Sequence, residues 1–133
     1  MNLTTQAAQV DCFLNAAAHL EPGGRFVVEV NVPQLRRLPP GDRANVIAVN
    51  DDYWGISEFD VVEQKLVSHH FTATEQGIRY RTIQFRYVWP SELDLMARLA
   101  GMTLAERWGG WRRERFTSDS THHVSVWRRA DDE

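Results

Sequence analysis

Two pairs of adjacent histidines are the residues of this sequence best suited to proton transfer. His69 and His70 lie in one run of strand-forming residues, and His122 and His123 lie in another. Successive side chains of a strand point to opposite faces, so only one member of each pair can point into a given cavity. Imidazole titrates near neutral pH and could therefore orient an amine or hydroxyl, or accept its proton. We select His69 as the substrate-side candidate, with a solvated strand histidine as the simpler alternative.

Aromatic side chains form the second group with a possible binding role. The candidates for contact with a small molecule are Tyr53, Trp54, Tyr87 and Trp111. Aromatic rings line ligand pockets but also fill cores and interfaces, so a packing role stays open for each. Trp111 lies among arginines and could stack on nucleic acid, but a formal net charge of −3 disfavours that partner.

The sequence predicts neither a metal site nor a disulfide. Cys12 is the single cysteine, and the histidines have no cysteine or carboxylate at metal-ligand spacing. The acidic residues Glu58, Asp60 and Glu63 are most simply a solvated turn. A single cysteine, no apolar run near the roughly 20 residues of a membrane span, and no signal core in MNLTTQAAQV favour a cytoplasmic protein without membrane contact.

The elements that must position these residues are two helices and two groups of strands. Apolar spacing predicts amphipathic helices over 4–20 and 90–100, ended by glycine-containing turns. Short β-forming runs between 45 and 88 predict an antiparallel meander, with a bulge near Thr82 where the apolar parity changes. Residues 25–32 predict an internal strand covered on both faces, with strands 103–108 and 122–129 flanking it in one sheet.

The order of these elements resembles the C-terminal half of a class I, Rossmann-like S-adenosylmethionine-dependent methyltransferase. The passage HLEPGGRFVVEV, from His19 to Val30, is similar to the family's path into its fifth strand. ELDLMARLAGM is similar to the helix before the sixth strand, here TLAERW, and HVSVWRR to the antiparallel seventh. The likeness runs from Asn2 to Arg129.

The resemblance implies a single α/β domain over 1–133, a partial Rossmann-like fold comprising the fifth to seventh strands and two helices. Residues 45–88 would be an antiparallel insertion, similar to the lid and dimer surface of small-molecule methyltransferases of the sugar-amine type. The implied reaction transfers a methyl group to a nitrogen or oxygen acceptor, chiefly through positioning and desolvation. The resemblance assigns no catalytic residue.

The family's cofactor signature is the part of the pattern that this sequence lacks. The eight glycines include no G-x-G, whereas the family holds S-adenosylmethionine with a glycine-rich turn and acidic residues. Asn2 and Leu3 match the loop that lines the methyl-donor pocket, and they are the cofactor-binding candidates. We therefore expect this chain alone to bind the donor weakly or not at all, and to be inactive alone. Its expected partners are a second copy of itself or a missing N-terminal half.

A rival hypothesis is a non-catalytic module. In this alternative, a curved antiparallel sheet with two helices binds a small ligand or serves as a dimerisation surface.

Overall fold

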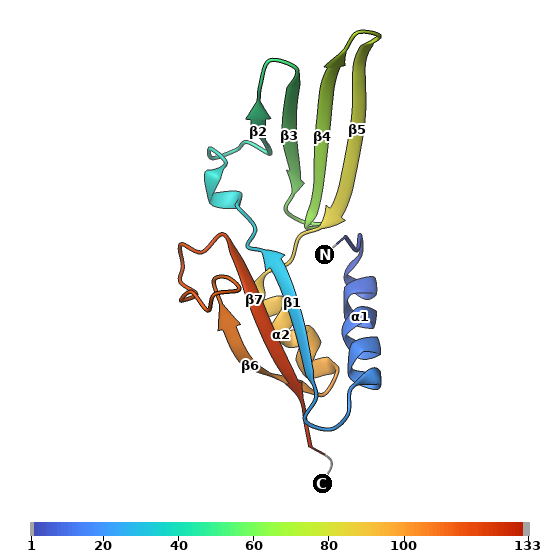
Figure 1. Ribbon diagram of the computed structural model, residues 1–133, viewed down its shortest axis with the longest axis vertical. Coiled ribbons are helices and arrows are strands. Elements are labelled where there is room, and N and C mark those ends of the chain that lie inside the picture. Colours follow the sequence, from blue (N-terminus) through green and yellow to red (C-terminus); the bar gives the residue numbers. More distant parts are fainter. Residues whose placement is uncertain (1, 132–133) are drawn as a thin grey trace. The chain divides into compact units, whose positions relative to one another are not determined.

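The computed structural model describes residues 2–131 of the chain, which form two compact units with two helices and two sheets. One unit, here called the α/β unit, comprises residues 5–33 and 88–131. The other, called the β unit, comprises residues 2–4 and 34–87. The mixed α/β composition agrees with the predicted fold class, and all the strands expected between 45 and 88 fall within the β unit (Figure 1).

The α/β unit contains two helices and a three-stranded antiparallel sheet. The helices are α1 (Gln6–His19) and α2 (Pro90–Leu99); the strands are β1 (Arg25–Asn31), β6 (Met102–Trp108) and β7 (His122–Arg129), in the order β1-β7-β6. Thr5 caps α1 by accepting a hydrogen bond from the amide of Ala8 at 3.1 Å. Gly23, at φ 74°, supplies the left-handed conformation that the turn into β1 requires.

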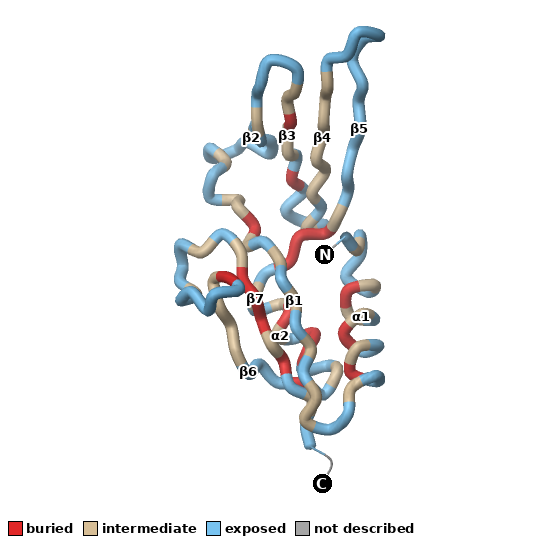
Figure 2. The backbone as a smooth tube through the Cα atoms, viewed as in Figure 1, coloured by how far each residue is buried: buried red, intermediate tan, exposed pale blue. Residues whose placement is uncertain are grey.

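The core of the α/β unit forms where both helices meet one face of its sheet. The ring of Phe13 on α1 packs edge-on against Phe26 and against Trp127, each with centroids 5.2 Å apart. Leu93 and Met96 place the buried side of α2 in the same core. Figure 2 shows the buried positions gathered on α1, α2 and β7. Both predicted helices are confirmed. Their predicted apolar stripes are buried only in part, because Leu14 is 44% exposed and Leu99 is 69% exposed.

The prediction that the first strand is internal and covered on both faces is wrong. Among the described residues β1 is an edge strand that pairs only with β7, and β6 pairs with the far side of β7 rather than flanking β1. Its side chains alternate between exposed and partly buried, and Val27 is 45% exposed. A continuous apolar run is compatible with an internal strand and with an edge strand. In the observed edge strand, Val27 and Glu29 point to the face opposite the helices.

The β unit is a four-stranded antiparallel meander, as the sequence predicts. A short 3-10 turn, η1 (Leu35–Arg37), precedes the strands. They follow in sequence order as β2 (Ala44–Val49), β3 (Tyr53–Asp60), β4 (Lys65–Thr74) and β5 (Gly77–Arg86). Every neighbouring pair is antiparallel, and a tight turn with Gly77 at φ 119° joins β4 to β5.

The predicted bulge near Thr82 is absent. β5 pairs with β4 in unbroken register from Gly77 to Arg86, and the irregularity lies in β2, between Val46 and Ala48. The apolar parity does change along β5, because Ile78 and Ile83 lie on opposite faces. An exposed strand tolerates this without a bulge, since neither face of β5 is fully buried.

Candidate functional site

The register of the β unit divides the candidate residues between two faces of its sheet. We call one the Trp54 face, which carries Trp54, Ile56, Glu58, His69, Phe71 and Tyr80. We call the other the Tyr53 face, which carries Tyr53, Gly55, Ser57, Ser68, His70 and Ile83. His69 and His70 lie on opposite faces, as predicted for adjacent strand residues.

The Trp54 face holds a row of stacked rings across three strands. Trp54 and Phe71 lie with centroids 5.5 Å apart and planes 7° from parallel, and Phe71 and Tyr80 with centroids 4.8 Å apart. These three residues are direct cross-strand partners, so the antiparallel register itself produces the row. The row offers an apolar ring surface to a small molecule, and Tyr80 at its end is 54% exposed.

His69 links this aromatic row to a carboxylate. Its Nδ1 lies 2.7 Å from the hydroxyl of Tyr80, and its Nε2 lies 3.3 Å from a carboxylate oxygen of Glu58. The three groups come from β5, β4 and β3, so they span three strands of the meander. Both imidazole nitrogens have a partner, which fixes the orientation of the ring. Sequence reasoning selected His69 but did not foresee Tyr80 or Glu58 as its partners.

A second tyrosine–histidine pair lies on the Tyr53 face. The hydroxyl of Tyr53 is 2.7 Å from Nδ1 of His70, whereas Nε2 of His70 is buried without a hydrogen-bond partner in the structure. The pair requires a glycine beneath it, because a Cβ at Gly55 would lie 2.8 Å from the Tyr53 hydroxyl. His70 was not selected as a candidate from the sequence. The only sequence signal for it was its position next to His69.

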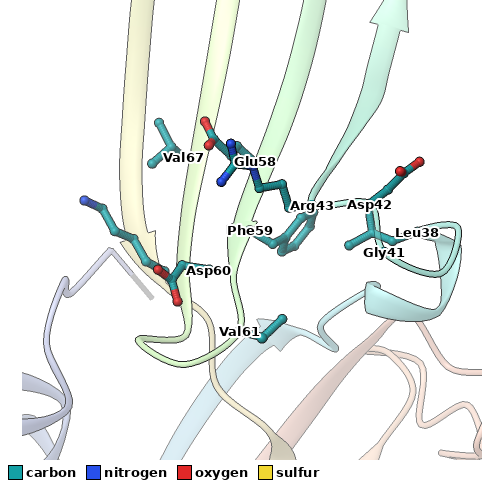
Figure 3. A pocket seen from close by; sticks show the side chains of 10 residues that line it. Leu38, Gly41, Asp42, Arg43, Glu58, Phe59, Asp60, Val61 and Val67 are labelled. Carbon is teal, nitrogen blue, oxygen red and sulfur yellow. The ribbon is translucent and has the colours of Figure 1, made fainter.

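A hollow of about 600 Å³ opens beside the β3–β4 turn. Figure 3 shows Phe59 among the lining residues, with the charged side chains of Arg43 and Glu58 close to each other beside it. The residues lining the hollow are Leu38, Gly41, Asp42, Arg43, Glu58, Phe59, Asp60, Val61, Lys65 and Val67. Glu58 belongs both to this lining and to the His69 cluster, so the hollow and the cluster adjoin.

The acidic residues near this turn have different roles. The carboxylate of Asp60 accepts hydrogen bonds from the amides of Val62 and Glu63 at 2.9 and 3.0 Å, which closes the β3–β4 turn. Glu58 instead binds His69. The interpretation of this acidic stretch as a turn therefore holds for Asp60 and Glu63 and is incomplete for Glu58.

Tyr87 occupies a packing position in the β unit. It is 6% exposed, its ring meets that of Phe59 at 6.0 Å, and its hydroxyl donates to the carbonyl of Asp60 at 3.4 Å. Burial raises the pKa of the Tyr87 phenol above its usual value, and the charge of Asp60 adds to this effect. Its ring and hydroxyl therefore both contact the last two residues of β3.

The remaining predicted residues are Asn2, Leu3 and Trp111. The carbonyl of Leu3 accepts a hydrogen bond from the amide of Arg86 at 3.0 Å, at the end of β5, and Asn2 is exposed. Trp111 belongs to the α/β unit, where it is 66% exposed between β6 and β7. The structure thus brings Trp54 and His69 to one face and Tyr53 to the other.

The α/β unit contains a partly buried polar network that sequence reasoning missed. Asp94 accepts two hydrogen bonds from Arg107, at 2.7 and 3.1 Å, and one from the indole of Trp127 at 2.9 Å. Arg107 also donates to Ser125, whose hydroxyl lies 2.7 Å from Nδ1 of His123. Burial, with a smaller contribution from the charge of Arg107, lowers the pKa of His123 to about 4, so its imidazole is neutral at pH 7.

Within residues 2–131, no group of three or more histidine, cysteine or acidic side chains is placed to hold a metal ion. Neither described helix has the length and hydropathy to cross a membrane.

Comparison with solved structures gives the strongest link to known proteins. No protein-family model and no curated protein sequence matches the chain. The CcbJ methyltransferase from Streptomyces caelestis is 40% identical, with a TM-score of 0.83 over 97% of this chain and 56% of its own.

Two more distant structures share the fold. An S-adenosylmethionine-dependent methyltransferase from Clostridium acetobutylicum is 10% identical with a TM-score of 0.66, over 91% of this chain and 50% of its own. An amino pentose methyltransferase from Micromonospora echinaspora, CalS10, is 20% identical with a TM-score of 0.58, over 96% and 53%.

The chain therefore spans about half the length of the solved proteins that it matches. The predicted resemblance to part of an S-adenosylmethionine-dependent methyltransferase is confirmed.

Proposed function

We propose that this chain, which resembles part of an S-adenosylmethionine-dependent methyltransferase, is the C-terminal portion of such an enzyme. The complete enzyme would transfer a methyl group to a nitrogen or oxygen of a small molecule in the cytoplasm. The observation that carries this proposal is 40% identity to the CcbJ methyltransferase over 97% of the chain. Identity at this level over nearly every element supports a shared chemistry as well as a shared fold.

The edge of the α/β unit supports the view that the fold is a partial Rossmann-like one. In the described part of the chain β1 pairs on one side only, and Val27 and Glu29 point to a face that neither described helix covers. An unpaired strand edge beside an uncovered apolar side chain is a surface that folded proteins usually protect. The proposal assigns this edge to the remaining strands of the methyltransferase sheet.

The described residues do not by themselves fit the methyl donor. The chain has no G-x-G turn, Asn2 is exposed, and the Leu3 carbonyl already accepts a hydrogen bond from Arg86. When bound to the complete enzyme, S-adenosylmethionine supplies an electrophilic methyl group on sulfur. In our proposal Asn2 and Leu3 contribute only one wall of its pocket, and the segment outside this chain supplies the rest.

The β unit is the proposed acceptor side of the enzyme. Its Trp54 face combines a ring surface, an exposed phenol, an imidazole and a carboxylate, and it adjoins a hollow with both signs of charge. Rings exclude water from an acceptor while a few polar groups orient it, and orientation is the main requirement of an in-line methyl transfer. Tyr53 and His70 offer a second, smaller polar pair on the opposite face.

A chimera tests the proposed function. The part of the CcbJ methyltransferase that this chain does not match is fused to the N-terminus of this chain, and melting is followed with and without S-adenosylmethionine. A ligand that binds only the folded state raises the melting temperature. At a ligand concentration one hundred times its Kd, the free energy of unfolding increases by about 2.7 kcal/mol. We expect the donor to stabilise the chimera and to leave this chain alone unchanged.

Two controls make the result interpretable. The melting temperature of the CcbJ segment alone must rise less with S-adenosylmethionine than that of the chimera. An equal rise would mean that this chain contributes nothing to the donor pocket. S-adenosylhomocysteine, which lacks the transferable methyl group, should stabilise the chimera in the same way. A chimera that melts cooperatively but ignores both ligands would contradict the proposed function.

A further inference from the structure

Of the two tyrosine–histidine pairs in the β unit, one continues to a carboxylate. Tyr80 contacts Nδ1 of His69 at 2.7 Å, and Nε2 of His69 contacts Glu58 at 3.3 Å. His70, the histidine of the other pair, has its Nε2 buried without a hydrogen-bond partner in the structure. We propose that Tyr80, His69 and Glu58 form a proton relay, in which the Tyr80 oxygen accepts the proton that a bound acceptor loses.

The hydrogen-bonding capacities of the three groups fix the direction of the relay. An ionised carboxylate can only accept, so the contact with Glu58 places the imidazole proton on Nε2 of His69. Nδ1 then carries a lone pair and accepts the hydroxyl proton of Tyr80. This leaves the lone pairs of the Tyr80 oxygen free to accept a hydrogen bond from another molecule, and the residue is 54% exposed.

The relay removes the proton of the acceptor in the methyl transfer proposed above, and the inference rests on that proposed function. The acceptor nitrogen or oxygen forms a bond to the methyl carbon of a sulfonium donor as the carbon–sulfur bond breaks, and sulfur keeps that electron pair. The proton of the acceptor passes to the Tyr80 oxygen while the Tyr80 hydroxyl proton moves to Nδ1 of His69. The resulting imidazolium is stabilised by the carboxylate of Glu58.

Packing holds the phenol in the position that the relay needs. The ring of Tyr80 lies 4.8 Å from that of Phe71, and it lies 6.0 Å from the imidazole of His69 with planes 10° from parallel. Glu58, at the end of the relay opposite Tyr80, also lines the neighbouring hollow.

Acetylation by N-acetylimidazole tests the relay on the 133-residue chain without a methyl donor. The phenol oxygen bonds to the acetyl carbon, imidazole leaves, and the phenol proton is taken up by a base. Mass spectrometry gives the rate at Tyr80. We expect Glu58→Gln and His69→Gln each to slow acetylation of Tyr80 about tenfold or more, as loss of a positioned base does. Thr82→Val, which removes a hydroxyl from the same face of β5, should leave the rate unchanged.

A second measurement guards against misfolded variants. The imidazole 15N shifts of His69 should report a proton on Nε2 in the unaltered chain, and circular dichroism must show that each variant melts cooperatively. Equal acetylation rates at Tyr80 in folded Glu58→Gln and unaltered protein, or a proton on Nδ1 of His69, would overturn the relay. If the relay is present but the chimera above ignores the donor, the proposed function fails and the relay stands.

Discussion

At the scale of single residues, His123 shows how burial converts a polar side chain into a pH-sensitive part of the core. It is fully buried in the α/β unit, and its pKa is lowered to about 4, chiefly by desolvation and then by the charge of Arg107. Asp94 acts in the opposite direction. The folded state therefore holds a neutral imidazole over a pH range in which the unfolded chain takes up a proton.

This shift predicts a loss of stability in acid. The unfolded histidine titrates near 6.5, so the contribution of His123 is complete above that pH and is lost as the pH falls toward 4, at up to about 1.4 kcal/mol per pH unit. Urea unfolding from pH 7 to 4.5 should show a shallower decline for His123→Phe than for the unaltered chain. Thr121→Val, a neighbouring change without a titrating group, should keep the full decline. Parallel pH curves for all three proteins would refute the prediction.

Gly55 gives a second test at this scale. A Cβ at this position would meet the Tyr53 hydroxyl at 2.8 Å, so Gly55→Ala should displace the phenol from His70 and cost about 1 kcal/mol, the value of one hydrogen bond. In a Tyr53→Phe background the hydroxyl is absent and the same change should be nearly neutral. Chemical unfolding of the two single variants and the double variant measures this coupling. Strictly additive costs would show that Tyr53 and Gly55 do not interact.

At the scale of elements, the sequence predicted which segments are helices and strands better than how the strands neighbour each other. Periodicity identified α1, α2 and the meander because those patterns are local. Strand order is not local: the valines of β1 suit a central strand or an edge strand equally. The choice between a central and an edge position depends on which distant strands pair with β1, and in the described residues only β7 does.

The candidate site shows the same limit. Strand alternation placed His69 and His70 on opposite faces from sequence alone. Their partners could not be predicted, because Glu58 and Tyr80 meet His69 across β3 and β5, and this depends on the register of both hairpins. The change of parity along β5 was visible in the sequence, but exposure of the strand removed the need for a bulge there.

The edge position of β1 leads to a prediction for hydrogen exchange. Within residues 2–131 no strand pairs with the β1 amides that point away from β7, so these amides should exchange with solvent faster than the amides of the central strand β7. Adding the CcbJ segment that this chain does not match should protect those β1 amides. Peptide-resolved exchange by mass spectrometry measures both effects. Association without any added protection along β1 would contradict the proposed place of the missing strands.

At the scale of the whole molecule, the exposed sheet of the β unit bears on self-association. The Tyr53 face carries the exposed aliphatic side chains Ile47 and Ile83 around the small residues Gly55, Ser57 and Ser68. A sheet face of this kind can pack against a second copy at the ordinary spacing of two sheets, about 10 Å. We expect a homodimer through this face, which leaves the Trp54 face open.

Sedimentation velocity tests the dimer. The unaltered chain should sediment as a dimer at micromolar concentration, and Ile83→Lys should shift it toward the monomer by placing a charge in the interface. Thr82→Lys, the adjacent position on the opposite face, should leave the dimer intact. A stable interface needs about 1,000 Å² or more of buried surface. A monomer at high concentration, or equal effects of the two lysines, would refute the prediction.

The central claim is that this chain is one part of a donor-binding fold, and calorimetry tests it most directly. S-adenosylmethionine is titrated first into the 133-residue chain, then into its mixture with the separate CcbJ segment that it does not match, and into that segment alone. We expect no measurable heat with the chain alone, and binding that appears only when the two polypeptides associate. Micromolar binding by the isolated chain, or associated polypeptides that take up no donor, would contradict it.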